Sequence, residues 1–353
     1  MHDRSIRRVA GGLLLLGISL AACASPPPKD DIRGALTAIG SPIQSDPIDA
    51  WTGAWQKSFK ATSLNYSPDG SKVGLTALAT GQAYFAALDA PLTSQDQAAT
   101  KTQCGPDGAF SVPTSITSVG VAFNLPSVRS LKLSPGVLAK IFSGEVTRWN
   151  DKAIATINPE LTLPNTPIVP ITASSASALT TASTRYLSSS ADWPSGVTDK
   201  WTKIPGGAEV KNLRDLVKKV DDTAGAVAFM DSASIGSRFD TALLSFGGPF
   251  TRMSKDSVAA AVQGGTSKTL GTGVEFSLPE KTDRGYALGT VNYQAFCTTY
   301  KNHQIASLVK SWGNFVLSPD GQFASGYFAG VASPSEQALQ DAARLIGKIG
   351  SLQ

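Results

Sequence analysis

Short β-rich runs alternate with helical stretches along most of this 353-residue chain, and this alternation limits its fold more than any other feature. Residues 119–124 and 168–171 have the composition of strands, and residues 212–220 have helical periodicity before the strand-like run 226–230. No internal repeat interrupts the pattern. Strands interleaved with helices predict α/β layers, and the length predicts two such domains.

Two helices have clear ends in the sequence. Ser134 and Pro135 are typical of a helix start, and Gly144 follows the last apolar position as a stop. Residues 333–336 begin a second helix near the carboxyl end, whose apolar stripe is made by Leu339, Ala342, Ala343, Ile346 and Ile349. This stripe predicts a closing helix packed on a sheet.

Charge and histidine content exclude several classes of protein. The formal net charge is +4, and the first 22 residues contribute +2 of it, so nothing favours a nucleic-acid partner. Of the two histidines, His2 lies in that segment and only His303 lies beyond it. Because there is no nucleophile-elbow pattern, His dyad or metal-ligand spacing, we predict no enzyme, cofactor or metal site. A catalytic serine activated by a lysine base remains an alternative, although no Ser-x-x-Lys run has a convincing context.

The first 22 residues are typical of a secretory signal peptide, because arginines precede an apolar run at residues 9–20 that is too short to span a bilayer. The ending Leu-Ala-Ala before Cys23 resembles the bacterial lipobox, which implies cleavage there and lipidation of Cys23. An ordinary signal followed by a chance cysteine is the alternative. Residues 23–35, with three consecutive prolines, then form a tether, and we expect an extracytoplasmic protein lipid-anchored to the bacterial cell membrane.

If Cys23 is lipidated, Cys104 and Cys297 remain. An even pair in an oxidising compartment favours one disulfide, and two separate buried thiols are the alternative.

The segment at residues 138–151, Leu-Ala-Lys-Ile-Phe-Ser-Gly-Glu-Val-Thr-Arg-Trp-Asn-Asp, resembles a signature of the periplasmic phosphate-binding proteins, the capture subunits of phosphate ABC importers. Further matches follow in the family's order at residues 64–71, 87–92, 121–126 and 225–229. Within the signature, Glu145, Arg148 and Asp151 are interpreted as helix-end and turn stabilisers and not as catalysts.

This resemblance implies a two-lobed type II periplasmic-binding-protein fold of the α/β class, with a ligand cleft between the lobes and two crossover strands. Lobe 1 would comprise residues 36–120 and 291–353, and lobe 2 residues 121–290. We expect a monomer.

The resemblance also implies ligand-binding residues in lobe 1. Asp89 matches the family aspartate that accepts a proton from hydrogen phosphate and so rejects sulfate. Ser71 matches the family serine whose hydroxyl and amide face the anion. Both also fit simpler roles, Asp89 as a cap before a turn and Ser71 as a helix N-cap.

In lobe 2 the family's Arg-Ser-Asp-Gly-Ser-Gly-Thr run corresponds to residues 173–179, where Ser174, Ser175 and Ser177 are the candidate donors. Ala173 replaces the arginine, and Pro42 and Ile43 replace a Thr-Phe pair in lobe 1. Losing a two-pronged arginine contact costs about 3 to 6 kcal/mol, which predicts weak phosphate binding unless Lys72 or Arg185 reaches the cleft. A solvated serine-rich turn without a ligand is the alternative.

We therefore expect a lipid-anchored substrate-binding protein that delivers phosphate, or a related small polar solute, to a membrane ABC permease. The competing hypothesis is a non-transport interaction or sensing module of the cell envelope that has lost phosphate binding. In that case side chains such as Ile43 and Leu179 would fill the cleft.

Overall fold

The computed structural model describes residues 32–126 and 128–352, and the chain from Ile32 onward forms one compact unit. The predicted signal peptide, Cys23 and the tether as far as residue 31 lie outside the described residues. In the described part of the chain, no helix is long and apolar enough to cross a membrane.

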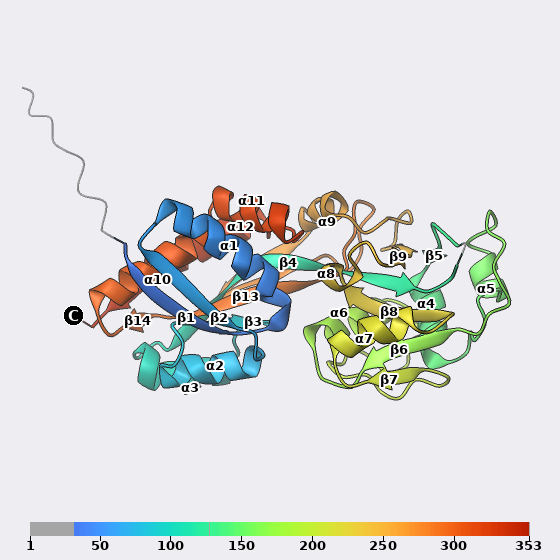
Figure 1. Cartoon of the computed structure of the whole chain (residues 1–353), viewed down its shortest axis with the longest axis horizontal. Coiled ribbons are helices and arrows are strands. Elements are labelled where there is room, and N and C mark those ends of the chain that lie inside the picture. The colour runs from blue at the N-terminus through green and yellow to red at the C-terminus, as the bar shows by residue number, and fades with distance from the viewer. Residues whose placement is uncertain (1–31, 127, 353) are drawn as a thin grey trace, which may run out of the picture. The chain divides into compact units, whose positions relative to one another are not determined.

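A continuous hydrogen-bonded sheet runs through the molecule in the strand order β2-β1-β3-β13-β4-β8-β6-β7 (Figure 1). The strands of the first half are β1 (Gly34–Gly40), β2 (Thr62–Ser67) and β3 (Phe85–Leu88). Those of the second half are β6 (Val169–Ala173), β7 (Ala208–Val210) and β8 (Ala226–Asp231). Strands within each half are parallel. We call these halves, with the helices packed on them, the first lobe and the second lobe.

Two long strands join the lobes, as the family resemblance implied. They are β4 (Ala109–Phe123) and β13 (Gly289–Cys297), which pair antiparallel. The second half of β4 continues into the second lobe, where Val119 to Phe123 pair with β8. β13 in turn pairs with β3 of the first lobe. The fold is therefore the two-lobed α/β arrangement with two crossover strands.

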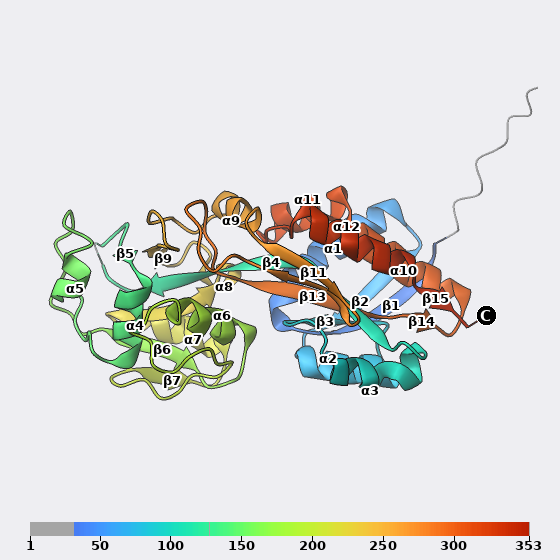
Figure 2. The ribbon, with the colours of Figure 1, turned by 180° about the vertical axis from the view of Figure 1, so that it is seen from behind.

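Helices cover both faces of the first-lobe sheet. Figures 1 and 2 show one group above the sheet and the other below it. The first group is α1 (Ser45–Ser58), α10 (His303–Leu317), α11 (Pro319–Phe328) and α12 (Glu336–Gly347). The second is α2 (Ser71–Thr80) and α3 (Ser94–Cys104). The predicted closing helix is thus α12, which packs beside α10 and on the sheet strands.

The second-lobe sheet is also covered on both faces. Val227 and Phe229 of β8 belong to one core cluster and Ala228 and Met230 to another, as strand alternation requires. The first cluster includes residues of α4 (Pro135–Ser143) and α6 (Ala178–Leu187), and the second those of α7 (Leu213–Asp221).

Shorter elements complete the chain. They are η1 (Pro42–Gln44), β5 (Lys132–Leu133), α5 (Lys152–Ala155), α8 (Ser232–Ile235), β9 (Asp240–Thr241), β10 (Leu243–Leu244), α9 (Lys255–Val262), β14 (Thr299–Tyr300) and β15 (Gly350–Ser351). A hairpin of β11 (Thr266–Leu270) and β12 (Gly273–Ser277) pairs with β4 at Ser111. It lies in the sequence range expected for lobe 2 but contacts the first lobe, where Gln97 donates to the Gly271 carbonyl over 2.9 Å.

Local sequence explains the element ends. At α4, the Ser134 hydroxyl accepts from Val137 N–H, Pro135 occupies the first turn, and Gly144 ends the helix with φ of 84°. These are the ends that the sequence predicted. The strand expected at residues 119–124 is the distal part of the longer β4.

The signature segment has a structural role. Trp149 is fully buried, and its indole N–H donates to the Gly225 carbonyl over 3.0 Å. Asp151 caps α5 by accepting from Ala153 N–H, and Arg148 donates to Asn165. The interpretation of Arg148 and Asp151 as turn and helix-end stabilisers is confirmed.

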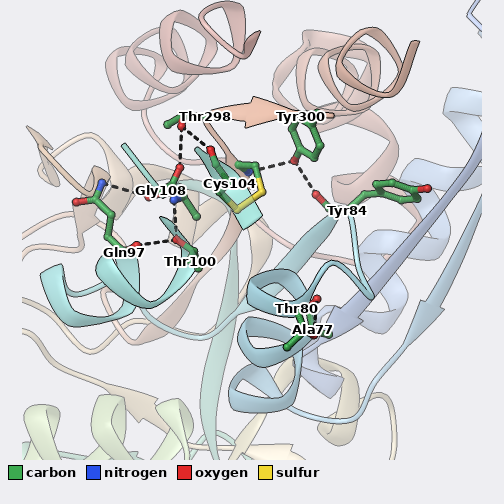
Figure 3. Close-up of a disulfide and its surroundings, with 11 residues drawn as sticks. Ala77, Thr80, Tyr84, Gln97, Thr100, Cys104, Gly108, Thr298 and Tyr300 are labelled. Carbon is green, nitrogen blue, oxygen red and sulfur yellow. Dashed lines mark hydrogen bonds between the residues drawn. A yellow bond between two sulfur atoms is a disulfide. The ribbon is translucent and has the colours of Figure 1, made fainter. Parts of the chain in front are cut away.

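Cys104 at the end of α3 and Cys297 at the end of β13 form the predicted disulfide, across a sequence separation of 193 residues (Figure 3). Thr298 donates to the Cys104 carbonyl over 3.0 Å, and Cys297 N–H donates to the Tyr300 hydroxyl over 3.1 Å. The disulfide therefore links α3 of the first lobe to the crossover strand β13.

Candidate ligand-binding site

A cavity of about 610 Å³ lies where the lobes face each other along the crossover strands. The first lobe contributes Asp89, directly after β3. The second contributes the start of α6, including Ser177 and Thr181, and β13 contributes Tyr293. The size falls within the range of protein sites for small molecules.

Asp89 is held by the first turn of α2. The Ser71 hydroxyl donates to Asp89 Oδ2 over 2.8 Å and accepts from the Asp89 backbone N–H over 3.1 Å. The other carboxyl oxygen, Oδ1, is buried and has no hydrogen-bond partner among the described residues. Burial raises the pKa of the Asp89 carboxyl, and the neighbouring hydroxyls of Ser41 and Ser71 offset part of that rise. A cavity-lining residue therefore keeps one buried carboxylate oxygen whose acceptor capacity the protein does not use.

Ser41 is a site residue that the sequence reasoning missed. It is 2% exposed, its hydroxyl accepts from Ile43 N–H over 3.3 Å, and its carbonyl accepts from the Tyr66 hydroxyl over 2.6 Å. Burial, followed by the charges of Asp89 and Asp69, raises the pKa of Tyr66. The Ser-Pro pair at positions 41 and 42 was the available signal, since it is typical of a helix start.

Close backbone packing brings α2 against β1. A β-carbon on Gly74 would lie 2.2 Å from the Ile39 carbonyl oxygen, and one on Gly40 would lie 2.1 Å from the Ala87 carbonyl oxygen. Side chains at these positions would separate α2, β1 and β3. The two glycines thus allow Ser71 to reach Asp89.

The second-lobe wall is the amino end of α6. Ser177 is the N-cap, whose hydroxyl accepts from Thr180 N–H over 3.1 Å. The N–H groups of Ala178 and Leu179 donate to no other group in the described part of the chain. A helix start with free amides favours an anionic ligand.

The structure brings together only some of the predicted residues. Asp89 and Ser177 line the cavity, whereas Ser71 touches Asp89 without lining it. Ser174 and Ser175 are not among the lining residues, and Ser174 N–H donates to the Val210 carbonyl.

The neighbouring positions leave the cleft open. Position 173 on β6 is a buried alanine, which is 3% exposed, so this position supplies no positive charge to the cavity. Neither Ile43 nor Leu179 lines the cavity, and Leu179 is buried in the second-lobe core. The cleft is not filled in the way that the competing hypothesis required.

Four carboxylates and one guanidinium lie around the cavity. The acids are Asp89, Asp199, Glu275 and Glu280, and Arg185 is the single cationic side chain among the lining residues that the structure describes. In the same described part, no group of three or more His, Cys, Asp or Glu side chains is placed to hold a metal ion.

Comparisons with known proteins agree with this architecture. A family model described as a PBP superfamily domain matches residues 25–320. Phosphate-binding protein PstS 3 of Mycobacterium tuberculosis is 28% identical over 305 residues, covering 83% of this chain and 80% of that protein. Its counterpart in Mycobacterium leprae is 27% identical over 329 residues, covering 85% and 88%.

Among solved structures, the phosphate-binding protein of Stenotrophomonas maltophilia superposes with a TM-score of 0.65 at 18% identity, covering 88% of this chain and 93% of that one. This likeness supports the two-lobed fold. With its crossover strands, interlobe cavity and matched family model, the chain belongs to the PBP superfamily of periplasmic binding proteins and resembles its PstS-type members.

Proposed function

We propose that this protein is the extracytoplasmic substrate-binding protein of an ABC importer and that its ligand is hydrogen phosphate. The observation that carries the proposal is Asp89, which lines the interlobe cavity and whose buried Oδ1 has no hydrogen-bond partner among the described residues. An ionised carboxylate there accepts a hydrogen bond but donates none. Hydrogen phosphate has a proton to give, whereas sulfate at neutral pH has none.

The opposite wall complements this acceptor. The free N–H of Ala178, which lines the cavity, and that of the next residue, Leu179, would donate to the ligand's unprotonated oxygens. The relatives named as phosphate-binding proteins support the same ligand. In this proposal the lobes close on phosphate and release it unchanged to a membrane permease, and the protein works as a monomer.

The anchor and the lobe boundaries belong to the same proposal. Cys23 would be lipidated after cleavage of residues 1–22, and residues 23–35 would tether the binding unit to the bacterial cell membrane. Lobe 1 would comprise residues 36–120 and 291–353, and lobe 2 residues 121–290, whose β11–β12 hairpin packs against lobe 1. Metabolic labelling with a radioactive fatty acid tests the anchor, and a Cys23→Ser variant should lose the label.

Thermal unfolding tests the ligand. A chain starting at residue 24 is freed of bound ligand by unfolding and refolding with its disulfide intact, and is then heated with phosphate or with sulfate. Ligand at a hundred times its dissociation constant stabilises the folded state by about 2.7 kcal/mol, which raises Tm by several degrees. A rise with millimolar phosphate and none with sulfate supports the proposal, and equal or absent shifts reject it.

A further inference from the structure

We propose that Arg185 is the cation that holds the bound oxyanion, acting as part of a binding subsite along one face of α6. This inference rests on the proposed function, since it assigns the residue that neutralises the ligand's charge. A dianion entering a cavity bordered by four carboxylates needs a positive partner. Arg185 is the cationic side chain that the described cavity lining offers.

The spacing on α6 places Arg185 on the correct face. Ala178, Thr181, Ala182 and Arg185 follow each other at intervals of i, i+3, i+4 and i+7, and all four line the cavity. Such positions share one side of a helix. Arg185 therefore lies on the cavity-lining face of α6, and that face begins at Ala178, whose N–H is one of the two free amides.

The direction of helical side chains shortens the distance along α6 between the Arg185 guanidinium and the free amides at the start of the helix. Arg185 lies two turns beyond Ala178, and side chains of a helix lean toward its amino end. From this position the guanidinium can reach over the turn that contains Thr181 and Ala182, about one turn, or about 5.4 Å of rise, from the free amides. Because Ala178 and Ala182 are small, no bulky side chain of α6 occupies that path.

Arg185 is also uncommitted. It forms no hydrogen bond or ion pair within the described residues, and its side chain is exposed. Its charge is nevertheless felt at the cavity wall, where it lowers the pKa of Tyr293 against the larger effect of burial. The Tyr293 hydroxyl is itself engaged, because it donates to the Phe276 carbonyl over 3.0 Å. Arg185 is left to bind the ligand, with a planar fork that suits two oxygens of a tetrahedral oxyanion.

The test is a calorimetric phosphate titration of four proteins starting at residue 24. They are the wild type, Arg185→Gln, Arg185→Lys and the control Arg214→Gln, which removes the same charge from an exposed site on α7 away from the cavity. Arg185→Gln should weaken phosphate binding about ten- to hundred-fold, and Arg185→Lys should fall between it and the wild type. Arg214→Gln should bind like the wild type. Tm without ligand, measured on all four, should stay within about 2 °C.

The outcomes distinguish a failure of the Arg185 assignment from a failure of the proposed phosphate-binding function. If the wild type binds phosphate and Arg185→Gln binds it equally well, the assignment of Arg185 is wrong and the proposed function stands. If Arg214→Gln loses as much affinity as Arg185→Gln, the effect is one of overall charge and the subsite is wrong. If the wild type binds no phosphate, the proposed function fails and the subsite fails with it.

Discussion

Ser71 and Asp89, 18 residues apart, are joined by two hydrogen bonds in opposite directions, one from the Ser71 hydroxyl to Asp89 Oδ2 and one from Asp89 N–H to the Ser71 oxygen. The single proton of the serine hydroxyl is thus donated within the protein. Ser71 therefore positions the carboxylate, and Asp89 Oδ1 keeps its acceptor capacity unused among the described residues. The first-lobe wall thus offers an acceptor, while the donors lie on α6.

The raised pKa of Asp89 predicts that the free energy of unfolding of the ligand-free protein depends on pH. A carboxyl whose folded pKa exceeds its ordinary value of 3.8 binds its proton more tightly in the folded state. Its contribution to stability is therefore complete below pH 3.8 and is lost as pH rises through the raised pKa. Each unit of the rise corresponds to about 1.4 kcal/mol.

Asp89→Asn should remove the loss of stability that the Asp89 carboxyl causes as pH rises. Urea unfolding of ligand-free protein from pH 4 to pH 7 should show the variant becoming progressively more stable than the wild type as pH increases. Asp199→Asn, at an exposed carboxyl on the same cavity, is the control for charge. Parallel stability curves for wild type and Asp89→Asn would show that Asp89 carries no such penalty.

Gly74→Ala should damage both stability and the site. The added carbon would lie 2.2 Å from the Ile39 carbonyl oxygen, so α2 must move away from β1 and take Ser71 from Asp89. We expect a loss of about 1 to 3 kcal/mol in the free energy of unfolding, measured with urea, together with weaker phosphate binding.

Gly53→Ala is the matched control. Gly53 lies within α1, and a β-carbon there meets nothing within 4 Å. Alanine should leave binding unchanged and stabilise the helix by up to about 1 kcal/mol. Equal effects of the two substitutions would refute the close-packing argument.

Removal of the disulfide should lower stability without removing the cavity. The bond between Cys104 and Cys297 closes a sequence separation of 193 residues, which in the chain-entropy model stabilises the fold by about 4 kcal/mol or more. The double variant Cys104→Ser and Cys297→Ser should unfold at a Tm roughly 10 °C lower. Neither cysteine lines the cavity, so phosphate affinity should be kept. An unchanged Tm would show that the bond adds little.

Local patterns allowed much of the fold to be predicted. The ends of α4 and the strand β8 follow from caps and apolar composition over a few neighbouring residues. The crossover strands and the lobes came from the family resemblance instead. Contacts of the β11–β12 hairpin with the first lobe were not foreseen, because no short-range signal specifies a partner so distant along the chain.

The candidate site could be predicted only in part. Asp89 and Ser177 lie in short runs that can be matched by eye, and both line the cavity. Ser174 and Ser175 lie in the same serine-rich run but not on the cavity wall, because the chain turns between β6 and α6. The position of Ser41 beside Asp89 depends on how β1 and β3 pair, and composition does not reveal that register.

The most direct test of the account is the ratio of phosphate to sulfate affinity, measured by calorimetric titration at pH 7.5 for wild type and Asp89→Asn. We expect the wild type to bind phosphate and not sulfate. Asp89→Asn should lose this preference by about tenfold or more, because an amide can donate to sulfate where the carboxylate could not. A wild type that binds both anions equally, or a variant with an undiminished preference for phosphate, would contradict the role of Asp89.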